Sequence, residues 1–181
     1  MAEIPALAGF GRRIMILGPS NSGKSTLAQA LGERLGVPAM HLDQLRHLPH
    51  TNWKERPDED FAALHDAAIL EPEWVMEGNY SNLMTQRLKR ATGILVITDT
   101  LTRRYQRYFH RSLFQKTRAG ALAGEQDGVT WKMVSWLWKT RDAVSKYRKI
   151  AAETGLPHHF VRDEQQLRAL YRAWDLTLPS G

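Results

Sequence analysis

The chain has 181 residues, of which 43% are hydrophobic and 24% are charged, and it contains no Cys. This length favours one domain, and the composition is that of a chain that folds around an apolar core. Without Cys the chain cannot form disulfides, Cys-bound zinc sites or iron–sulfur clusters, and it cannot use a thiol nucleophile. No apolar stretch is long enough to span a membrane, and the first residues do not resemble an export signal, so we expect a cytoplasmic protein.

Short apolar runs alternate with helical patterns along the chain. The apolar run 13–17 is bounded by Gly18 and Pro19, which is typical of a buried strand followed by a turn. The chain predicts strands at 13–17, 37–42, 74–77, 93–98 and 158–162, and helices at 24–35, 57–69, 83–90, 101–118, 131–152 and 164–174. Five strands that alternate with helices predict a parallel sheet covered on both faces.

The net charge of +6 is concentrated in one region, because residues 103–149 contain 12 Lys and Arg but only 3 Asp and Glu. Glycines at positions 120, 124 and 128 permit movement between two predicted helices, which makes this region a candidate lid. A basic segment suits a polyanionic ligand, which could be a nucleoside triphosphate or a nucleic acid.

The segment from Gly18 to Ser25 fits the phosphate-loop pattern G-x-x-x-x-G-K-[ST] in full, between a predicted strand and a predicted helix. Its glycines let successive N–H groups point inward at the positive end of the helix. Lys24 would reach the β- and γ-phosphates and assist transfer, and the Ser25 hydroxyl would be a Mg²⁺ ligand. We therefore expect ATP and Mg²⁺ as cofactors. The residues expected to contact the nucleotide are Gly18, Pro19, Ser20, Asn21, Ser22, Gly23, Lys24, Ser25 and Thr26.

Further segments give the chain a family resemblance between about Arg13 and Arg162. The segments are His41-Leu-Asp43, Trp53-Lys-Glu-Arg56-Pro57, Trp74-Val-Met-Glu77-Gly78-Asn79-Tyr80, Arg87-Leu88 and the strand that ends at Asp99. Together they resemble the adenylate-kinase-related P-loop proteins of the topology modulation (FlaR-like) family. The resemblance implies a three-layer α/β fold whose five-stranded parallel sheet has the nucleoside-kinase-like order 2-3-1-4-5. It also implies one domain over 1–181, with an acceptor-binding insert at about 43–72 and a mobile lid at about 112–130.

The resemblance further implies that lid arginines stabilise the transferring phosphate, whose charge spreads over its oxygens in the transition state. Arg107 and Arg111 lie one helical turn apart and match this catalytic role best. Arg103, Arg104 and Arg118 are possible substitutes. Any one of these arginines could equally lie on a solvated helix face.

Five other side chains are candidates for the acceptor, the metal or the purine. Asp43 follows the second predicted strand, where related kinases carry an acidic residue that orients or deprotonates the acceptor hydroxyl; it could instead be a turn or N-cap residue. Glu77 stands where the relatives carry an Asp that holds Mg²⁺ through water. The phosphate-binding Arg that these relatives carry shortly after the Gly is missing after Gly78. Arg56 or Arg87 could replace it as a ligand of the acceptor, and each could equally be a surface ion-pair residue. The purine would lie near Arg162.

These observations predict an enzyme that transfers the γ-phosphate of Mg·ATP to a small-molecule or nucleotide acceptor. The alternative is an ATP-dependent nucleic-acid-binding protein that modulates DNA topology, in which the basic segment contacts phosphates. The phosphotransferase is the preferred interpretation, because a lid that handles a triphosphate must itself be basic.

Overall fold

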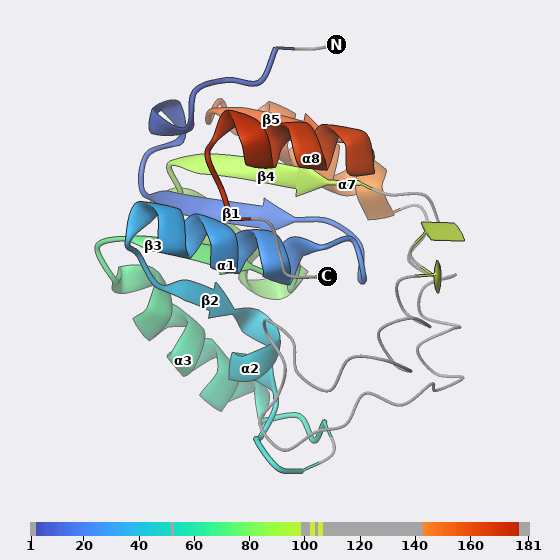
Figure 1. Cartoon of the computed structure of the whole chain (residues 1–181). Helices are drawn as coiled ribbons and strands as arrows, with labels where there is room; N and C mark the ends of the chain where they lie inside the picture. The colour runs from blue at the N-terminus through green and yellow to red at the C-terminus, as the bar shows by residue number, and fades with distance from the viewer. Residues whose placement is uncertain (1–2, 52, 99–101, 104, 107–142, 178–181) are drawn as a thin grey trace.

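The computed structural model describes residues 3–51, 53–98, 102–103, 105–106 and 143–177 (Figure 1). Five parallel strands in this part of the chain form one sheet in the order β2-β3-β1-β4-β5. The strands are β1 (Arg13–Leu17), β2 (Ala39–His41), β3 (Trp74–Glu77), β4 (Gly93–Ile97) and β5 (His158–Val161). The sheet confirms the predicted fold class and the strand order that the resemblance implied.

Helices cover both faces of the sheet (Figure 1). One face carries α1 (Lys24–Leu35) and α8 (Glu164–Ala173), which pack on alternate β1 residues such as Ile14 and Ile16. The intervening residues Met15 and Leu17 belong to a second core on the opposite face. The elements of that side are α2 (Leu42–Arg46), α3 (Asp58–Leu70), α4 (Met84–Arg90) and α7 (Ala143–Glu153). Two short 3-10 turns are η1 (Leu7–Phe10) and η2 (Ser81–Leu83).

Three elements, β1, β3 and α1, have the predicted bounds. The predicted strand 37–42 is shorter in the structure, because Leu42 begins α2, a five-residue helix that the sequence did not predict. The predicted helix 83–90 begins one residue later, after the 3-10 turn η2. The lid predicted at 112–130 lies outside the described residues, and of the helix predicted at 131–152 the structure describes the part from Ala143 onward.

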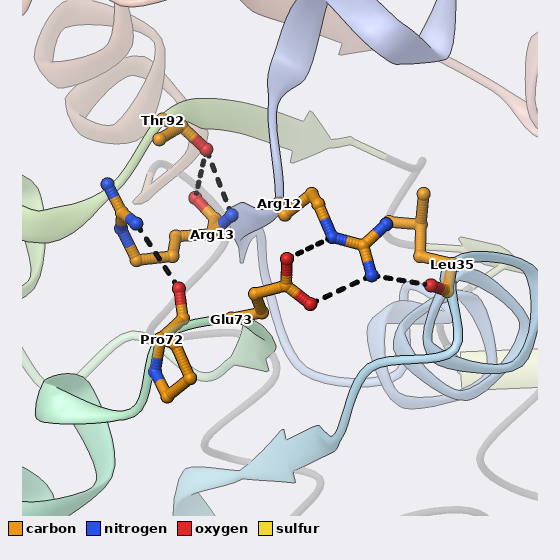
Figure 2. Close-up of polar contacts among 6 residues, drawn as sticks. All are labelled: Arg12, Arg13, Leu35, Pro72, Glu73 and Thr92. Atoms are coloured by element: carbon orange, nitrogen blue, oxygen red, sulfur yellow. Dashed lines mark hydrogen bonds and ion pairs between the residues drawn. The ribbon is translucent and has the colours of Figure 1, made fainter.

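Side chains near the amino ends of the strands form hydrogen bonds and an ion pair with neighbouring segments (Figure 2). The Arg12 guanidinium forms an ion pair with Glu73 and donates to the carbonyl oxygen of Leu35, 2.9 Å away. The Thr92 hydroxyl contacts Arg13 twice, since it accepts from the N–H at 2.9 Å and donates to the C=O at 3.1 Å. These contacts fix the amino end of β1, at the edge of the sheet opposite to the phosphate loop.

No helix among the described residues is long and apolar enough to cross a membrane.

The core under α1 generates a prediction about stability. The Leu31 side chain is fully buried between α1 and the sheet, whereas Leu70 at the end of α3 is 68% exposed. Leu31→Ala should lower the free energy of unfolding by about 3 kcal/mol, because it removes buried methyl groups and leaves a cavity. Leu70→Ala is the matched control and should change it by less than about 0.5 kcal/mol. Urea denaturation of both variants checks this, and equal losses would contradict the assigned core.

A buried histidine generates a prediction about pH. The His65 side chain is inaccessible to solvent, and its Nε2 has no partner among the described residues. Burial lowers the pKa of His65, an effect to which the charge of Arg87 adds and which a hydrogen bond to Asp66 opposes. The unfolded chain therefore binds a proton near the ordinary pKa of about 6.5, where the folded chain does not.

Stability should consequently fall as the pH drops below about 6.5, and part of this loss should disappear in His65→Leu. The exposed His50 provides the control, because His50→Asn should keep the wild-type dependence. Urea midpoints between pH 7.5 and 5 measure the effect. An unchanged pH dependence in His65→Leu would show that this side chain does not contribute.

Candidate functional site

The phosphate loop connects the carboxyl end of β1 to the amino end of α1, as predicted. Gly18 has φ 148° and Gly23 has φ 93°, both in a region that side chains disfavour. A Cβ added at Gly18 would lie 2.2 Å from the carbonyl oxygen of Ile97, so only glycine fits there. Gly23 is the N-cap residue of α1 and has no side chain with which to cap the helix. The first turn can therefore direct its N–H groups toward an anion.

The Lys24 side chain folds back over this loop. Its Nζ atom donates to the carbonyl oxygen of Pro19, 2.8 Å away. This contact places a positive charge above the loop where phosphate groups would bind. The structure thus brings together the lysine, the glycines and the helix end that the sequence pattern predicted to act together.

A buried carboxylate lies beside the loop. Glu77 ends β3 and is 4% exposed, and its Oε1 accepts a hydrogen bond of 2.8 Å from the Ser25 hydroxyl. The Nδ1 atom of His41, at the end of β2, lies 3.0 Å from the same oxygen. Burial alone would raise the pKa of Glu77, but the His41 hydrogen bond, the Lys24 charge and the Ser25 hydroxyl lower it below its usual range. Glu77 is therefore ionised at neutral pH.

The donor set of this corner suits Mg²⁺. The Ser25 hydroxyl and the Glu77 carboxylate are hard oxygen donors, and both stand next to a loop that would hold phosphate oxygens. Among the described residues no three His, Asp or Glu side chains form a closed metal site. A cation at Ser25 would therefore need phosphate or water to complete its coordination, which is the usual arrangement for Mg²⁺ at a nucleotide.

A second carboxylate lies at the same edge of the sheet. Asp43 is in the first turn of α2, and its Oδ1 accepts a hydrogen bond of 2.6 Å from the Tyr80 hydroxyl. Burial and the nearby Asp43 charge raise the pKa of Tyr80, so this hydroxyl stays protonated and donates. The N-cap residue of α2 is His41, so Asp43 does not cap this helix. The Tyr80 hydrogen bond holds the Asp43 side chain and joins the segment that follows β2 to the segment that follows β3.

The two arginines predicted to bind the acceptor or the purine have different surroundings. Arg56 lies in the insert, where its N–H donates to Arg46 across a short antiparallel pairing, and its Nε has no partner among the described residues. Arg162 follows β5 and is exposed, and its backbone N–H donates to Gln166. Arg56 remains a candidate anion ligand, and Arg162 lies at the carboxyl edge of the sheet.

Arg87 lies in a position that differs from the one predicted. Its side chain is 0% exposed, and its guanidinium donates to the carbonyl oxygens of Gly78, Asn79 and Tyr80 at 2.8, 2.6 and 3.0 Å. The guanidinium therefore binds the backbone beneath the site, and it is not open to an acceptor. The sequence offered Arg87 as an acceptor ligand, and its burial was not foreseen because a buried arginine without a carboxylate partner is rare.

The arginines predicted for the lid, Arg107 and Arg111, lie outside the described residues, as do Arg104 and Arg118. The described Arg103 is exposed, and its Nη1 lies 3.5 Å from an oxygen of Glu164 at the start of α8.

Three residues of the site had no assigned role in the sequence analysis. They are His41, Asn79 and Tyr80, which contact Glu77, Gly18 and Asp43 respectively. All three belong to segments that carried the family resemblance, and each stands at or just after the end of a strand. Their polar character at a sheet edge was the available signal, but their partners lie far away in the sequence.

Comparison with known proteins identifies a family and a fold for the chain. The family model described as an AAA domain matches residues 14–126, and the chain belongs to that family. No curated protein sequence matches the chain. Among solved structures, a gluconokinase from Sinorhizobium meliloti 1021 has a TM-score of 0.53 and 18% identity, with 91% of this chain and 90% of that chain covered. Shikimate kinase from Acinetobacter baumannii, in complex with shikimate, has a TM-score of 0.51 and 16% identity, with coverages of 94% and 98%. The chain therefore has the fold of a kinase-like P-loop NTPase.

The Ser25–Glu77 contact generates a prediction about metal dependence. Glu77→Gln keeps the size of the side chain but removes its charge. In the absence of Mg²⁺ the variant should bind ADP with the affinity of the wild type. In the presence of Mg²⁺ it should bind ADP about tenfold or more weakly than the wild type does. Calorimetric titration with and without Mg²⁺ measures this difference.

Glu73→Gln is the matched control, because Glu73 is a half-buried carboxylate that precedes the same strand at its opposite end. It should leave the Mg²⁺ effect unchanged. The same Mg²⁺ effect in Glu77→Gln as in the wild type would remove Glu77 from the metal site.

Proposed function

We propose that this member of the AAA domain family is a phosphotransferase that moves the γ-phosphate of Mg·ATP to a small-molecule or nucleotide acceptor. One observation carries the proposal. The Asp43 carboxylate, held by Tyr80, lies at the same sheet edge as the phosphate loop with Lys24 and the Ser25–Glu77 pair. A carboxylate held at this place can take the proton of an acceptor hydroxyl, which is the general-base role that phosphate transfer to an alcohol needs.

In this proposal the donor side is formed by the loop and α1. The N–H groups of the first helical turn and the Lys24 ammonium bind the β- and γ-phosphates, and they stabilise the charge that develops during transfer. Mg²⁺, when bound at Ser25 and near Glu77, supplies further neutralisation of the phosphate oxygens. The same proposal includes the roles that the family resemblance implies for three arginines. Arg107 and Arg111 stabilise the transferring phosphate from the lid, and Arg162 lies near the purine.

The acceptor side is formed by the insert, which we propose to span about 43–72 of a single domain with a lid at about 112–130. Asp43 accepts a hydrogen bond from the acceptor hydroxyl and takes its proton as the oxygen attacks the γ-phosphorus. The new bond joins the acceptor oxygen to phosphorus, the bond to the β-phosphate oxygen breaks, and ADP leaves. Arg56, whose Nε has no partner among the described residues, is the proposed ligand for an anionic group of the acceptor.

The fate of γ-labelled phosphate tests the proposal. The chain is incubated with labelled ATP and Mg²⁺, alone and with nucleosides, nucleoside monophosphates, hydroxylated metabolites or DNA. We expect the label on an organic acceptor. Label that appears only in free phosphate, at a rate that DNA increases, would replace the proposal by a nucleic-acid-dependent ATPase, the alternative function.

Two variants make the assay specific to the site. Lys24→Ala should lower the rate of phosphate transfer about a hundredfold or more, because it removes the positive charge that stabilises the transferring phosphate. Asp43→Asn should lower transfer about a hundredfold while MgADP affinity stays the same, because it removes the proton acceptor and leaves the loop unchanged. The exposed residues Lys89 and Asp175 supply the controls Lys89→Ala and Asp175→Asn, which should behave as wild type. Full activity in Asp43→Asn would remove this carboxylate from the mechanism.

A further inference from the structure

The three residues that follow β3 contact both halves of the proposed site. The first contact is made by Asn79, whose side-chain amide faces the first glycine of the phosphate loop. Its Oδ1 accepts from the Gly18 N–H at 3.3 Å, and its Nδ2 donates to the Gly18 carbonyl oxygen at 2.9 Å. One side chain therefore satisfies both backbone groups of a residue that, as glycine with φ 148°, has wide conformational freedom of its own.

The second contact is made by the next residue, Tyr80. Its hydroxyl donates to Asp43, and its ring packs edge-on against Phe61 of α3, with centroids 4.9 Å apart. The backbone of Tyr80 has φ 25° and ψ 77°, a conformation that a residue with a side chain disfavours. Such strain persists only where surrounding contacts enforce it, and it concentrates at functional sites.

The enforcing contact is made by Arg87. Its guanidinium donates to the carbonyl oxygens of three successive residues, 78, 79 and 80, and thereby fixes three adjacent peptide groups. Burial lowers the pKa of Arg87 to about 10, so it remains charged at neutral pH. Among the described residues no carboxylate forms an ion pair with it, so its charge is stabilised by carbonyl dipoles. Burial of a charge without an ionic partner costs free energy, which the three hydrogen bonds offset in part.

We propose that Asn79 and Tyr80 are positioning residues on one rigid segment, fixed by Arg87, that sets the phosphate loop and the Asp43 carboxylate at a constant separation. The inference deepens the proposed function and rests on it for the role of Asp43. Asn79 acts through Gly18 on the nucleotide, and Tyr80 acts through Asp43 on the acceptor. Because transfer requires reacting atoms about 3 Å apart, a fixed separation between the two sides contributes directly to the rate.

The chain contains a matched comparison for Asn79. Thr92 makes the same two-atom contact with a backbone N–H and C=O, but at Arg13, at the opposite end of β1 (Figure 2). Removal of either side chain breaks two hydrogen bonds to the backbone at one end of the same strand. Only the Asn79 contact is adjacent to the phosphate loop. A purely structural role predicts similar effects from both substitutions, whereas a positioning role does not.

The first experiment compares Asn79→Ala with Thr92→Val. Both variants should unfold at a lower temperature than the wild type. Asn79→Ala should weaken MgADP binding about tenfold in a calorimetric titration, because the loop loses the contact that fixes Gly18. Thr92→Val should bind MgADP as the wild type does. Equal MgADP affinities in the two variants would overturn the role of Asn79.

If Asn79→Ala does not fold, Asn79→Leu replaces it, because leucine keeps the volume of the side chain and removes its hydrogen-bonding atoms. The readout of this arm is nucleotide affinity, which does not require that the chain transfer phosphate. If the wild type transfers label to no acceptor, the proposed function is wrong. The role of Asn79 is tested separately, because its readout is MgADP affinity alone.

The second experiment uses Tyr80→Phe, which removes only the hydroxyl that holds Asp43. MgADP affinity and the KM for ATP should stay at the wild-type values, whereas kcat for transfer to the acceptor should fall about tenfold. Tyr171→Phe, which removes a hydroxyl from α8 on the opposite face of the sheet, should change neither quantity. Wild-type kcat in Tyr80→Phe, or a loss of nucleotide affinity equal to the loss of kcat, would overturn the role of Tyr80.

Discussion

The rest of the site depends on how the chain leaves the end of β3, at residues 77–80. Glu77 closes the strand with its carboxylate beside Ser25, and the Gly78 N–H still continues the sheet by donating to Ile16 at 3.4 Å. Gly78 has φ 129°, and a Cβ there would lie 2.8 Å from Leu42, so α2 can approach only because this residue is glycine. The strand can therefore turn directly into the segment that contacts both the phosphate loop and Asp43. The groups that we propose for the metal, the phosphate donor and the acceptor thus all contact this one segment of backbone.

Local patterns were sufficient to predict the strand, loop and helix that form the phosphate loop. The strand 13–17, the glycine-rich loop and the helix 24–35 are adjacent in the sequence, and each depends on interactions within a few residues. The order of the strands came instead from the resemblance, because spacing alone does not decide which strands become neighbours. The alternation of Ile14 and Ile16 with Met15 and Leu17 between two cores shows why continuous apolar runs predicted a sheet buried on both faces.

The part of the site that we propose for the acceptor could be predicted only in part, because its contacts join residues that lie far apart in the sequence. Nothing near Arg87 in the sequence indicates that its guanidinium turns inward to three carbonyl groups, so it was assigned to the acceptor. The short helix α2 was missed for a similar reason. Its five residues are too few for a periodic pattern, and burial of Leu42 against Gly78 helps to fix where it begins. The contact of Tyr80 with Asp43 spans 37 positions.

A crystal structure of the chain with MgADP tests the central claim most directly. We expect the β-phosphate to lie against the N–H groups of the phosphate loop and Lys24 Nζ to contact it in place of Pro19. We also expect Mg²⁺ beside Ser25 and Glu77, with the Asn79 amide still in contact with Gly18. A nucleotide bound away from the loop, or an Asn79 side chain displaced from Gly18 when the nucleotide binds, would overturn the proposed site.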